Sequence, residues 1–199
     1  MRELLLVRHA FAGSNRDGIA SCAVPGEGLT AEGIEQARAL SAALASEEIG
    51  IALTSQLART QQTLELALNG RDLPIVVAEE LDEIHFGDFD GGPLDTYRAW
   101  AAAHPPTDLP PGSGESRAQA AERFARGLRL LLARPEEHVL VVGHALAIRY
   151  VVDAADGLAP AARMSPIEHA FPYRLAREDV ERAATLLEEW SRTPQFRVT

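Results

Sequence analysis

Leu4-Leu5-Leu6-Val7-Arg8-His9 is the stretch that decides the fold, because four consecutive apolar residues end abruptly in a charged pair. A continuous apolar run of this length is typical of a strand that is buried on both faces of a sheet. Three further runs have the length and flanks of buried strands: 51–53, 75–77 and 139–142. Strands of this kind occur in parallel sheets that carry helices on both faces.

Amphipathic helical patterns separate or follow these runs. Thr30 and Ser55 are placed to cap two helices, and Asn69-Gly70 is a stop signal for the second. Two more apolar stripes with helical spacing lie at 121–131 and 180–190. The alternation of strand and helix predicts the α/β class, as a three-layer α/β/α sandwich with a mostly parallel central sheet.

The segment 86–115 breaks this rhythm, since it is rich in glycine and proline around a short helical patch at 97–103. It is too short and too aromatic to be a linker between domains. We therefore expect a single domain over 1–199, with 86–115 inserted over the active site.

Composition excludes several classes of function. With 46% hydrophobic and 24% charged residues the chain is ordinary for a globular protein. Its formal net charge of -10 repels nucleic acid and anionic membranes, so we expect neither as a partner. Cys22 is the only cysteine, which excludes an internal disulfide. The N-terminal apolar run is too short for a signal peptide or a membrane span, so the expected location is cytoplasmic.

Arginine and histidine side chains follow the predicted strands where each strand ends. Arg8 and His9 end the first run, Arg59 falls in the first turn of the helix after the second, and His144 ends the fourth. In open α/β sheets ligands bind beyond the carboxyl ends of the strands, so we expect these side chains to converge. The guanidinium fork matches phosphate oxygens. The sequence therefore predicts a pocket for a phosphoryl group.

These residue types fit phosphoryl transfer through a covalent intermediate. A neutral imidazole held at one nitrogen can attack phosphorus with the other, which makes His9 the candidate nucleophile. His144 and the two arginines would stabilise charge on the phosphoryl oxygens. Glu83, which is followed by the apolar residues Ile84 and Phe86 in the segment after the third strand, is the candidate acid for the leaving group.

Further motif pieces occur in a fixed order across most of the chain. They are Asn15, Leu29-Thr30-x-x-Gly33-x-x-Gln36-Ala37, Ser55-x-x-x-Arg59-Thr60, Leu81-x-Glu83, Gly114-Glu115-Ser116 and Val142-Gly143-His144. Together with the first strand, this order and spacing resemble the histidine phosphatase superfamily, the clan of phosphoglycerate mutases and related acid phosphatases.

The resemblance implies a phosphoglycerate mutase-like fold and a role for each matching residue. His9 resembles the phosphorylated nucleophile and Glu83 the proton donor. The phosphate pocket implied by the family consists of Arg8, Asn15, Arg59, His144 and the backbone N–H of Ala145. The family also implies that no metal and no organic cofactor is needed, and that the partner is a small phosphorylated substrate.

The chain departs from the family pattern beside the nucleophile and after the donor. Ala10-Phe11-Ala12 replaces the usual glycine followed by glutamate and a hydroxyl residue, and Phe89-Asp90-Gly91 replaces the tryptophan-acid-glycine run. We therefore expect a more apolar substrate wall than in sugar-phosphate enzymes. Its candidate residues are Phe11, Cys22, Tyr97 and Trp100.

Three other functions compete with phosphomonoester hydrolysis. One is a metal-dependent hydrolase, whose candidate ligands are Asp82, Glu83, His85, Asp88 and Asp90. Another is a phosphoglycerate mutase, and the third is a catalytically silent phosphate-binding module. Between Phe86 and Glu115 the only basic residue besides histidine is Arg98, whereas mutases of this family usually carry a more basic insertion. We therefore favour net hydrolysis. The chain is also compatible with a homodimer.

Overall fold

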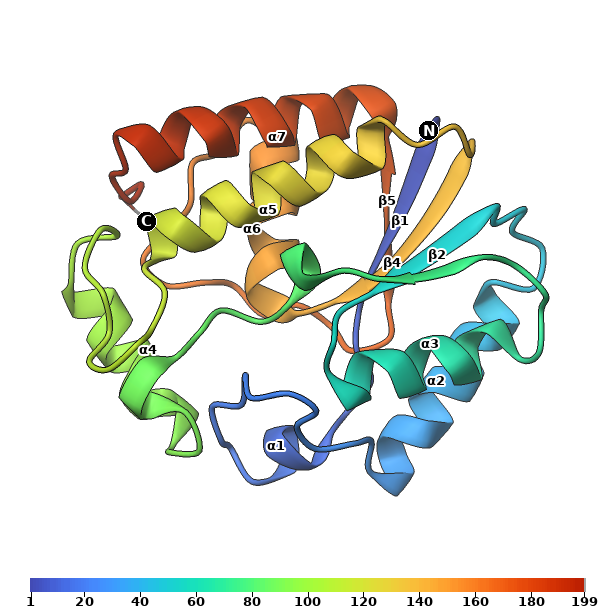
Figure 1. Ribbon diagram of the computed structural model, residues 1–199, viewed down its shortest axis with the longest axis horizontal. Helices are drawn as coiled ribbons and strands as arrows, with labels where there is room; N and C mark the ends of the chain where they lie inside the picture. The colour runs from blue at the N-terminus through green and yellow to red at the C-terminus, as the bar shows by residue number, and fades with distance from the viewer. Residues whose placement is uncertain (199) are drawn as a thin grey trace.

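The computed structural model describes residues 1–198 and places a five-stranded sheet between two layers of helices (Figure 1). The strand order is β3-β2-β4-β1-β5, and all neighbours are parallel except β1 and β5. The strands are β1 (Glu3–Arg8), β2 (Ile51–Thr54), β3 (Ile75–Val77), β4 (His138–Gly143) and β5 (Pro172–Ala176). The predicted α/β/α sandwich with a mostly parallel sheet is confirmed.

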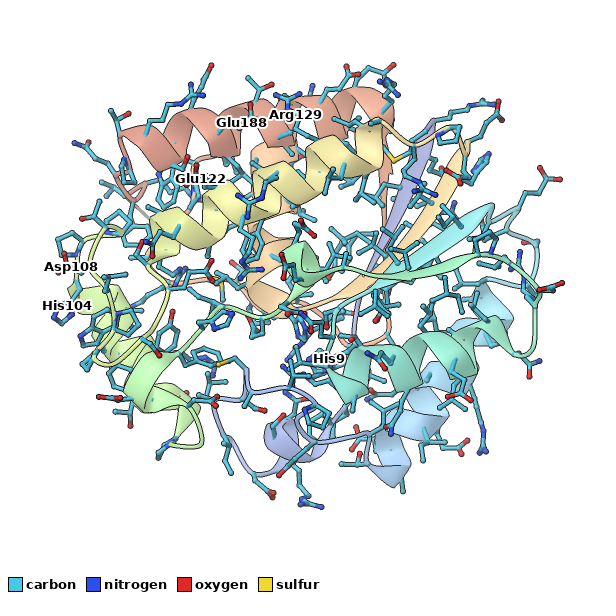
Figure 2. All side chains as sticks on the ribbon, in the orientation of Figure 1. His9, His104, Asp108, Glu122, Arg129 and Glu188 are labelled. Carbon is cyan, nitrogen blue, oxygen red and sulfur yellow. The ribbon has the colours of Figure 1, made fainter. Side chains whose placement is uncertain are left out.

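The helices form two groups on opposite faces of the sheet. On one face lie α2 (Ala31–Ala43) and α3 (Ala58–Leu68), and on the other lie α5 (Arg117–Leu132), α6 (Ala145–Ala155) and α7 (Arg177–Arg192) (Figure 1). An ion pair between Arg129 and Glu188, 2.7 Å long, joins the outer sides of α5 and α7 (Figure 2). The short helices are α1 (Gly13–Arg16), η1 (Glu79–Leu81), η2 (Gly87–Phe89) and α4 (Leu94–Ala103).

Alternate side chains of β1 enter two different cores. Leu4 and Leu6 belong to the cluster that includes residues of α5, α6 and α7, whereas Leu5 and Val7 pack with residues of α2 and α3. Successive strand side chains point to opposite faces, so a strand covered on both sides must be apolar at every position. This burial explains the unbroken apolar run and holds the end of β1, where Arg8 and His9 lie, in a fixed position.

Three details differ from the sequence-based predictions. The strand β3 is not buried, because it lies at the sheet edge, where Ile75 and Val77 are 53% and 51% exposed. Ser55 does not cap α3, which begins at Ala58 after Leu57. The antiparallel strand β5 was not predicted, since Pro172-Tyr-Arg-Leu-Ala176 has neither an apolar run nor regular alternation.

The segment 86–115 contains η2 and α4 and supplies Phe86, Leu94, Tyr97 and Arg98 to the wall of the main cavity. The predicted helical patch at 97–103 is therefore part of α4. Among residues 1–198, no helix has the length and apolar character needed to cross a membrane.

Candidate active site

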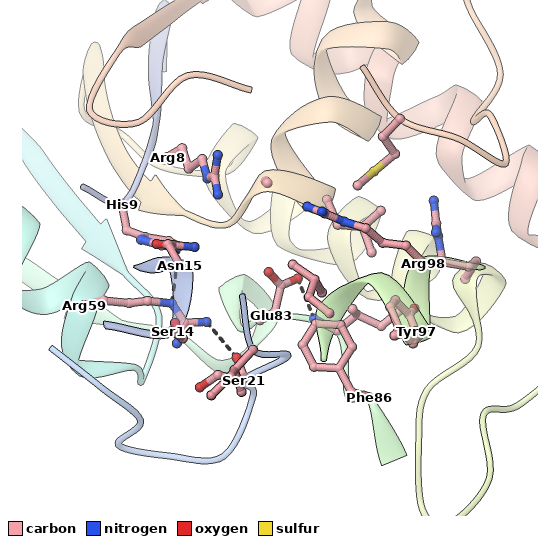
Figure 3. Close-up of a pocket in the computed structure, with 17 residues that line it drawn as sticks. Arg8, His9, Ser14, Asn15, Ser21, Arg59, Glu83, Phe86, Tyr97 and Arg98 are labelled. Carbon is pink, nitrogen blue, oxygen red and sulfur yellow. Dashed lines mark hydrogen bonds between the residues drawn. The ribbon is translucent and has the colours of Figure 1, made fainter. Parts of the chain in front are cut away.

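The carboxyl ends of β1, β2 and β4 open onto one cavity that collects most of the predicted residues (Figure 3). Its lining includes Arg8, His9, Asn15, Arg59, Glu83 and Ala145. His144 is fully buried beside it, with its ring centre 5.3 Å from that of His9. The arginine and histidine side chains that follow the strands therefore lie close together, as the sequence predicts.

His9 is held in one tautomer by two contacts. Its Nδ1 lies 2.8 Å from the carbonyl oxygen of Ala10, which can only accept, so Nδ1 carries the hydrogen. Its Nε2 accepts from Nε of Arg59 at 3.3 Å and keeps a lone pair. Burial, with help from the Arg59 and Arg8 cations, lowers the pKa of His9 well below its usual value. The unprotonated Nε2 of this neutral ring is thus the candidate nucleophile.

His144 is fixed in the opposite tautomer by a chain of hydroxyl groups. Thr60 donates to the carbonyl oxygen of Leu57 at 2.7 Å, so its oxygen accepts from Ser55 at 2.7 Å. The Ser55 oxygen in turn accepts from Nε2 of His144 at 2.9 Å. Nδ1 of His144 then carries the lone pair and accepts from Arg59 at 3.3 Å. Protonation at Nδ1 would give an imidazolium that keeps its bond to Ser55.

Replacing Thr60 with valine should weaken the binding of inorganic phosphate by about 1–3 kcal/mol. Without its acceptor, the Ser55 hydroxyl is expected to donate to His144 and to disfavour the imidazolium. Phosphate inhibition constants and ¹⁵N shifts of the His144 ring measure both effects. Thr54→Val is the control, since the Thr54 hydroxyl makes only a 3.4 Å contact with the Ser55 carbonyl. An unchanged ring tautomer in T60V would contradict the hydroxyl chain.

The two arginines keep donor atoms free in a buried place. Arg8 donates from Nη1 to the carbonyl oxygen of Ile167 at 2.7 Å, and Arg59 donates from Nη2 to that of Ser21 at 2.9 Å. Nε of Arg8 and Nη1 of Arg59 are buried without a partner among residues 1–198. Burial lowers the pKa of Arg8 to about 10 and also lowers that of Arg59. Guanidinium groups start from so high a pKa that both side chains stay charged near neutrality. Buried cations with free donors are suited to a bound anion.

Glu83 lies beside this anion pocket with the properties of a proton donor. One carboxyl oxygen accepts from the backbone N–H of Ile84 at 2.9 Å, and the other lies 3.9 Å from Nδ1 of His144. The side chain is only 14% exposed. Burial raises the pKa of Glu83, and the positive charge of Arg59 partly opposes this effect. A raised pKa is the property that a carboxyl group needs to act as a proton donor near neutrality.

The loop after His9 is fixed by the motif that begins at Thr30. The N–H of Phe11 donates to Gln36 at 2.9 Å, and the carbonyl oxygen of Phe11 accepts from Thr30. A Cβ at Gly33 would lie 2.0 Å from that oxygen, so only glycine permits this approach. Thr63 accepts from the N–H of Ala10 at 2.9 Å. These contacts explain why Thr30, Gly33 and Gln36 share the spacing noted in the sequence.

Gly33→Ala should displace this loop and lower kcat/KM by about tenfold or more, because reacting groups tolerate little misplacement. The overlap with the Phe11 carbonyl should also cost about 1–3 kcal/mol of stability. Steady-state kinetics and denaturant unfolding measure the two effects. Gly127→Ala, where the nearest atom is a side-chain carbon 3.3 Å away, is the control. Wild-type kinetics in G33A would refute the role of the loop.

The two remaining predicted phosphate ligands, Asn15 and Ala145, both have N–H groups to offer a ligand. Asn15 uses its side-chain oxygen to accept from the N–H of Ala12 at 3.0 Å, which leaves its amide donors for a ligand. Ala145 is the first residue of α6, so its N–H has no partner within the helix. Of the four candidate wall residues only Tyr97 is among those that line the cavity; Phe11, Cys22 and Trp100 are not.

The acids named for a metal-dependent hydrolase do not form a ligand set. Asp82 accepts from the backbone and side chain of Gln56 at 2.7 and 3.0 Å, and Asp90 accepts from the N–H of Cys22. In the part of the chain that the structure describes, no three His, Cys, Asp or Glu side chains are grouped so as to hold a metal ion.

Sequence reasoning missed some residues at the site. His169 donates from Nδ1 to the carbonyl oxygen of His9 at 2.7 Å, and its ring lies 5.5 Å from that of His9. It precedes β5, whose strand character was also missed. The sequence pattern predicts a helix cap at Ser55 and no functional role for Arg117. An arginine directly after the Gly114-Glu115-Ser116 motif was the only signal for Arg117.

Comparisons with known proteins agree with this geometry. Residues 4–190 match the family model described as the histidine phosphatase superfamily (branch 1). An adenosylcobalamin/alpha-ribazole phosphatase of Escherichia coli K12 is 34% identical over 150 residues, which cover 71% of this chain and 72% of the relative. A 2,3-bisphosphoglycerate-dependent phosphoglycerate mutase of Methylobacterium is 35% identical over 65% of this chain and 69% of its own length.

Among solved structures, the alpha-ribazole phosphatase of Shigella flexneri superimposes with a TM-score of 0.70 at 27% identity. The match covers 87% of this chain and 95% of that one. The likeness thus extends to the three-dimensional arrangement of the elements that carry the cavity.

Proposed function

This chain belongs to branch 1 of the histidine phosphatase superfamily, and we propose that its substrate is a small phosphomonoester with a partly apolar leaving group. It is a phosphoric monoester hydrolase. One observation carries the proposal: the phosphate donors and the Glu83 carboxyl share a cavity with an apolar wall. That wall consists of Ile19, Ile84, Phe86, Leu94, Leu146 and Met164.

The proposed reaction begins at His9. Its Nε2 lone pair forms a bond to phosphorus while the bond from phosphorus to the leaving oxygen breaks, and Glu83 supplies the proton that this oxygen needs. Arg8 and Arg59 stabilise the charge on the other phosphoryl oxygens. Burial and the Arg59 cation lower the pKa of His144, so its Nδ1 becomes a donor only when the negative charge of the bound phosphoryl group favours the imidazolium. The product of this half-reaction is phosphohistidine.

Hydrolysis of the intermediate uses the same groups in reverse. The Glu83 carboxylate takes a proton from water, whose oxygen attacks phosphorus as the bond to Nε2 of His9 breaks. Phosphate leaves, and Glu83 is again protonated. The contact of Nδ1 of His9 with the Ala10 carbonyl supports this cycle, because it keeps Nε2 directed to phosphorus throughout.

A mutase remains the second candidate, since relatives include phosphoglycerate mutases. A mutase must retain a bisphosphorylated intermediate instead of losing phosphate to water. The segment 86–115 offers Arg98 as its only lysine or arginine, and the Arg98 guanidinium is paired with Asp95 at 3.0 Å. This scarcity of free cations over the pocket favours net hydrolysis.

The test is a panel of phosphomonoesters assayed in the presence of a chelator. It includes α-ribazole 5′-phosphate, because relatives are named alpha-ribazole phosphatases, together with alkyl phosphates and 3-phosphoglycerate. We expect phosphate release from at least one ester with an apolar leaving group. Faster conversion of 3- to 2-phosphoglycerate than release of phosphate would favour the mutase, and loss of activity on chelation would favour a metal-dependent hydrolase.

A further inference from the structure

Arg117 is a buried cation in the cavity wall that the proposed reaction does not use. The residue is 6% exposed and lines the cavity. Its Nε donates to the hydroxyl of Tyr150 at 2.7 Å, and one Nη donates to the carbonyl oxygen of Ala161 at 3.5 Å. Both partners are neutral, and none of the ion pairs among residues 1–198 involves Arg117. A buried cation without a counter-ion is costly to maintain.

Tyr97 presents a second unused donor to the same cavity. It lies across the cavity from His9 and packs against Phe86 (Figure 3). The residue is 4% exposed, and its hydroxyl is buried without a hydrogen-bond partner in the described chain. Burial raises the pKa of this hydroxyl, while the charge of Arg117 acts in the opposite direction. The hydroxyl therefore stays protonated and close to the Arg117 charge.

We propose that Arg117 and Tyr97 form a second subsite, which binds a carboxylate carried by the leaving group of the substrate. The remaining guanidinium nitrogen of Arg117 and the hydroxyl of Tyr97 are two donors, which matches the two oxygens of a carboxylate. This subsite rests on the proposed function, since the leaving group must occupy the cavity while its phosphoryl group lies at His9.

Aromatic rings pack against the Arg117 guanidinium, but they do not satisfy the hydrogen-bond donors of Arg117 and Tyr97. The Arg117 charge lies 5.1 Å from the centre of the Tyr150 ring and 5.7 Å from that of Phe196. These rings stabilise the cation, but they accept no hydrogen bond from the third nitrogen or from Tyr97. They instead hold the guanidinium in place for a ligand.

The test compares ω-phosphono carboxylates of three to six carbons with alkyl phosphonates of the same chain length. Phosphonates are not hydrolysed, so titration calorimetry on the otherwise intact protein measures binding alone. For at least one length we expect the carboxylate to bind about tenfold or more tightly, the scale of a charge-assisted pair. In Arg117→Met the ratio of the two affinities, carboxylate over alkyl phosphonate, should fall to near one.

Two further variants isolate the subsite from general effects. Arg126→Met removes the same charge from an exposed position of α5 and should keep the wild-type ratio. Tyr97→Phe removes one oxygen atom and should reduce the ratio severalfold, which decides the matter if R117M does not fold. No carboxylate preference at any chain length, or an undiminished one in R117M or Y97F, would overturn the proposal.

A second assay distinguishes failure of the proposed hydrolysis from failure of the subsite. The corresponding phosphate esters are then tested for phosphate release by the wild-type protein. Release without a carboxylate preference in the calorimetric series refutes the subsite alone. A carboxylate preference that depends on Arg117, combined with no release from any ester, refutes the hydrolysis and leaves the subsite standing.

Discussion

His9→Ala should lower kcat by roughly 10⁴-fold or more, the scale reported for loss of a nucleophile that acts as part of a catalytic unit. The only lone pair on His9 is at Nε2, because Nδ1 donates to the Ala10 carbonyl. His169 does not replace it, since His169 is not among the residues that line the cavity. Alanine removes the acceptor of the phosphoryl group and leaves the surrounding arginines in place.

The measurement is phosphate release under substrate saturation, followed by rapid-quench labelling with a ³²P-labelled ester. Wild-type protein should form an acid-labile phosphoprotein within one turnover, and the variant should form none. His138→Ala is the matched control, because His138 begins β4 at the opposite end of the strand from His144 and pairs with Glu3. Acid-labile label of equal amount in H9A would place the nucleophile elsewhere.

Sequence alone predicted the positions of Arg8, His9, Arg59 and His144 because these positions depend on simple rules. Strands covered on both faces are apolar throughout, and their ends meet at one edge of a parallel sheet. The first polar residue after such a strand must therefore lie at that edge. Only the order of strands remained open, and β1, β4 and β2 proved to be neighbours.

Residues whose roles depend on contacts between distant segments were not predictable. Ser55 and Thr60 fix the tautomer of His144, although Ser55 precedes His144 by 89 positions, and no local pattern encodes this relation. From the sequence, Arg117 is expected to be an exposed arginine at the start of a helix. Its burial arises from the way Tyr150 and Phe196 enclose it. Likewise, β5 became a strand through pairing with β1, against its own weak propensity.

Glu83→Gln should lower kcat/KM for alkyl phosphates by about 10²–10⁴-fold, the usual contribution of a general acid. The amide has nearly the same shape as the carboxyl group but donates no proton to an alkoxide. With p-nitrophenyl phosphate, whose leaving group needs no proton, the loss should stay below about tenfold, since bond breaking there depends little on general acid catalysis. Glu79→Gln, at an exposed position, is the matched control.

The pH dependence gives an independent measure of the same role. Burial raises the pKa of Glu83, so its acidic form persists closer to neutrality than for an exposed glutamate. As pH rises through that pKa the proton is lost, and kcat/KM for alkyl phosphates should decline on the basic side. His9, whose pKa is lowered, remains neutral over the same range and adds no basic limb. The decline should vanish in E83Q and be absent with p-nitrophenyl phosphate. A basic limb that survives in E83Q would assign the proton to another group.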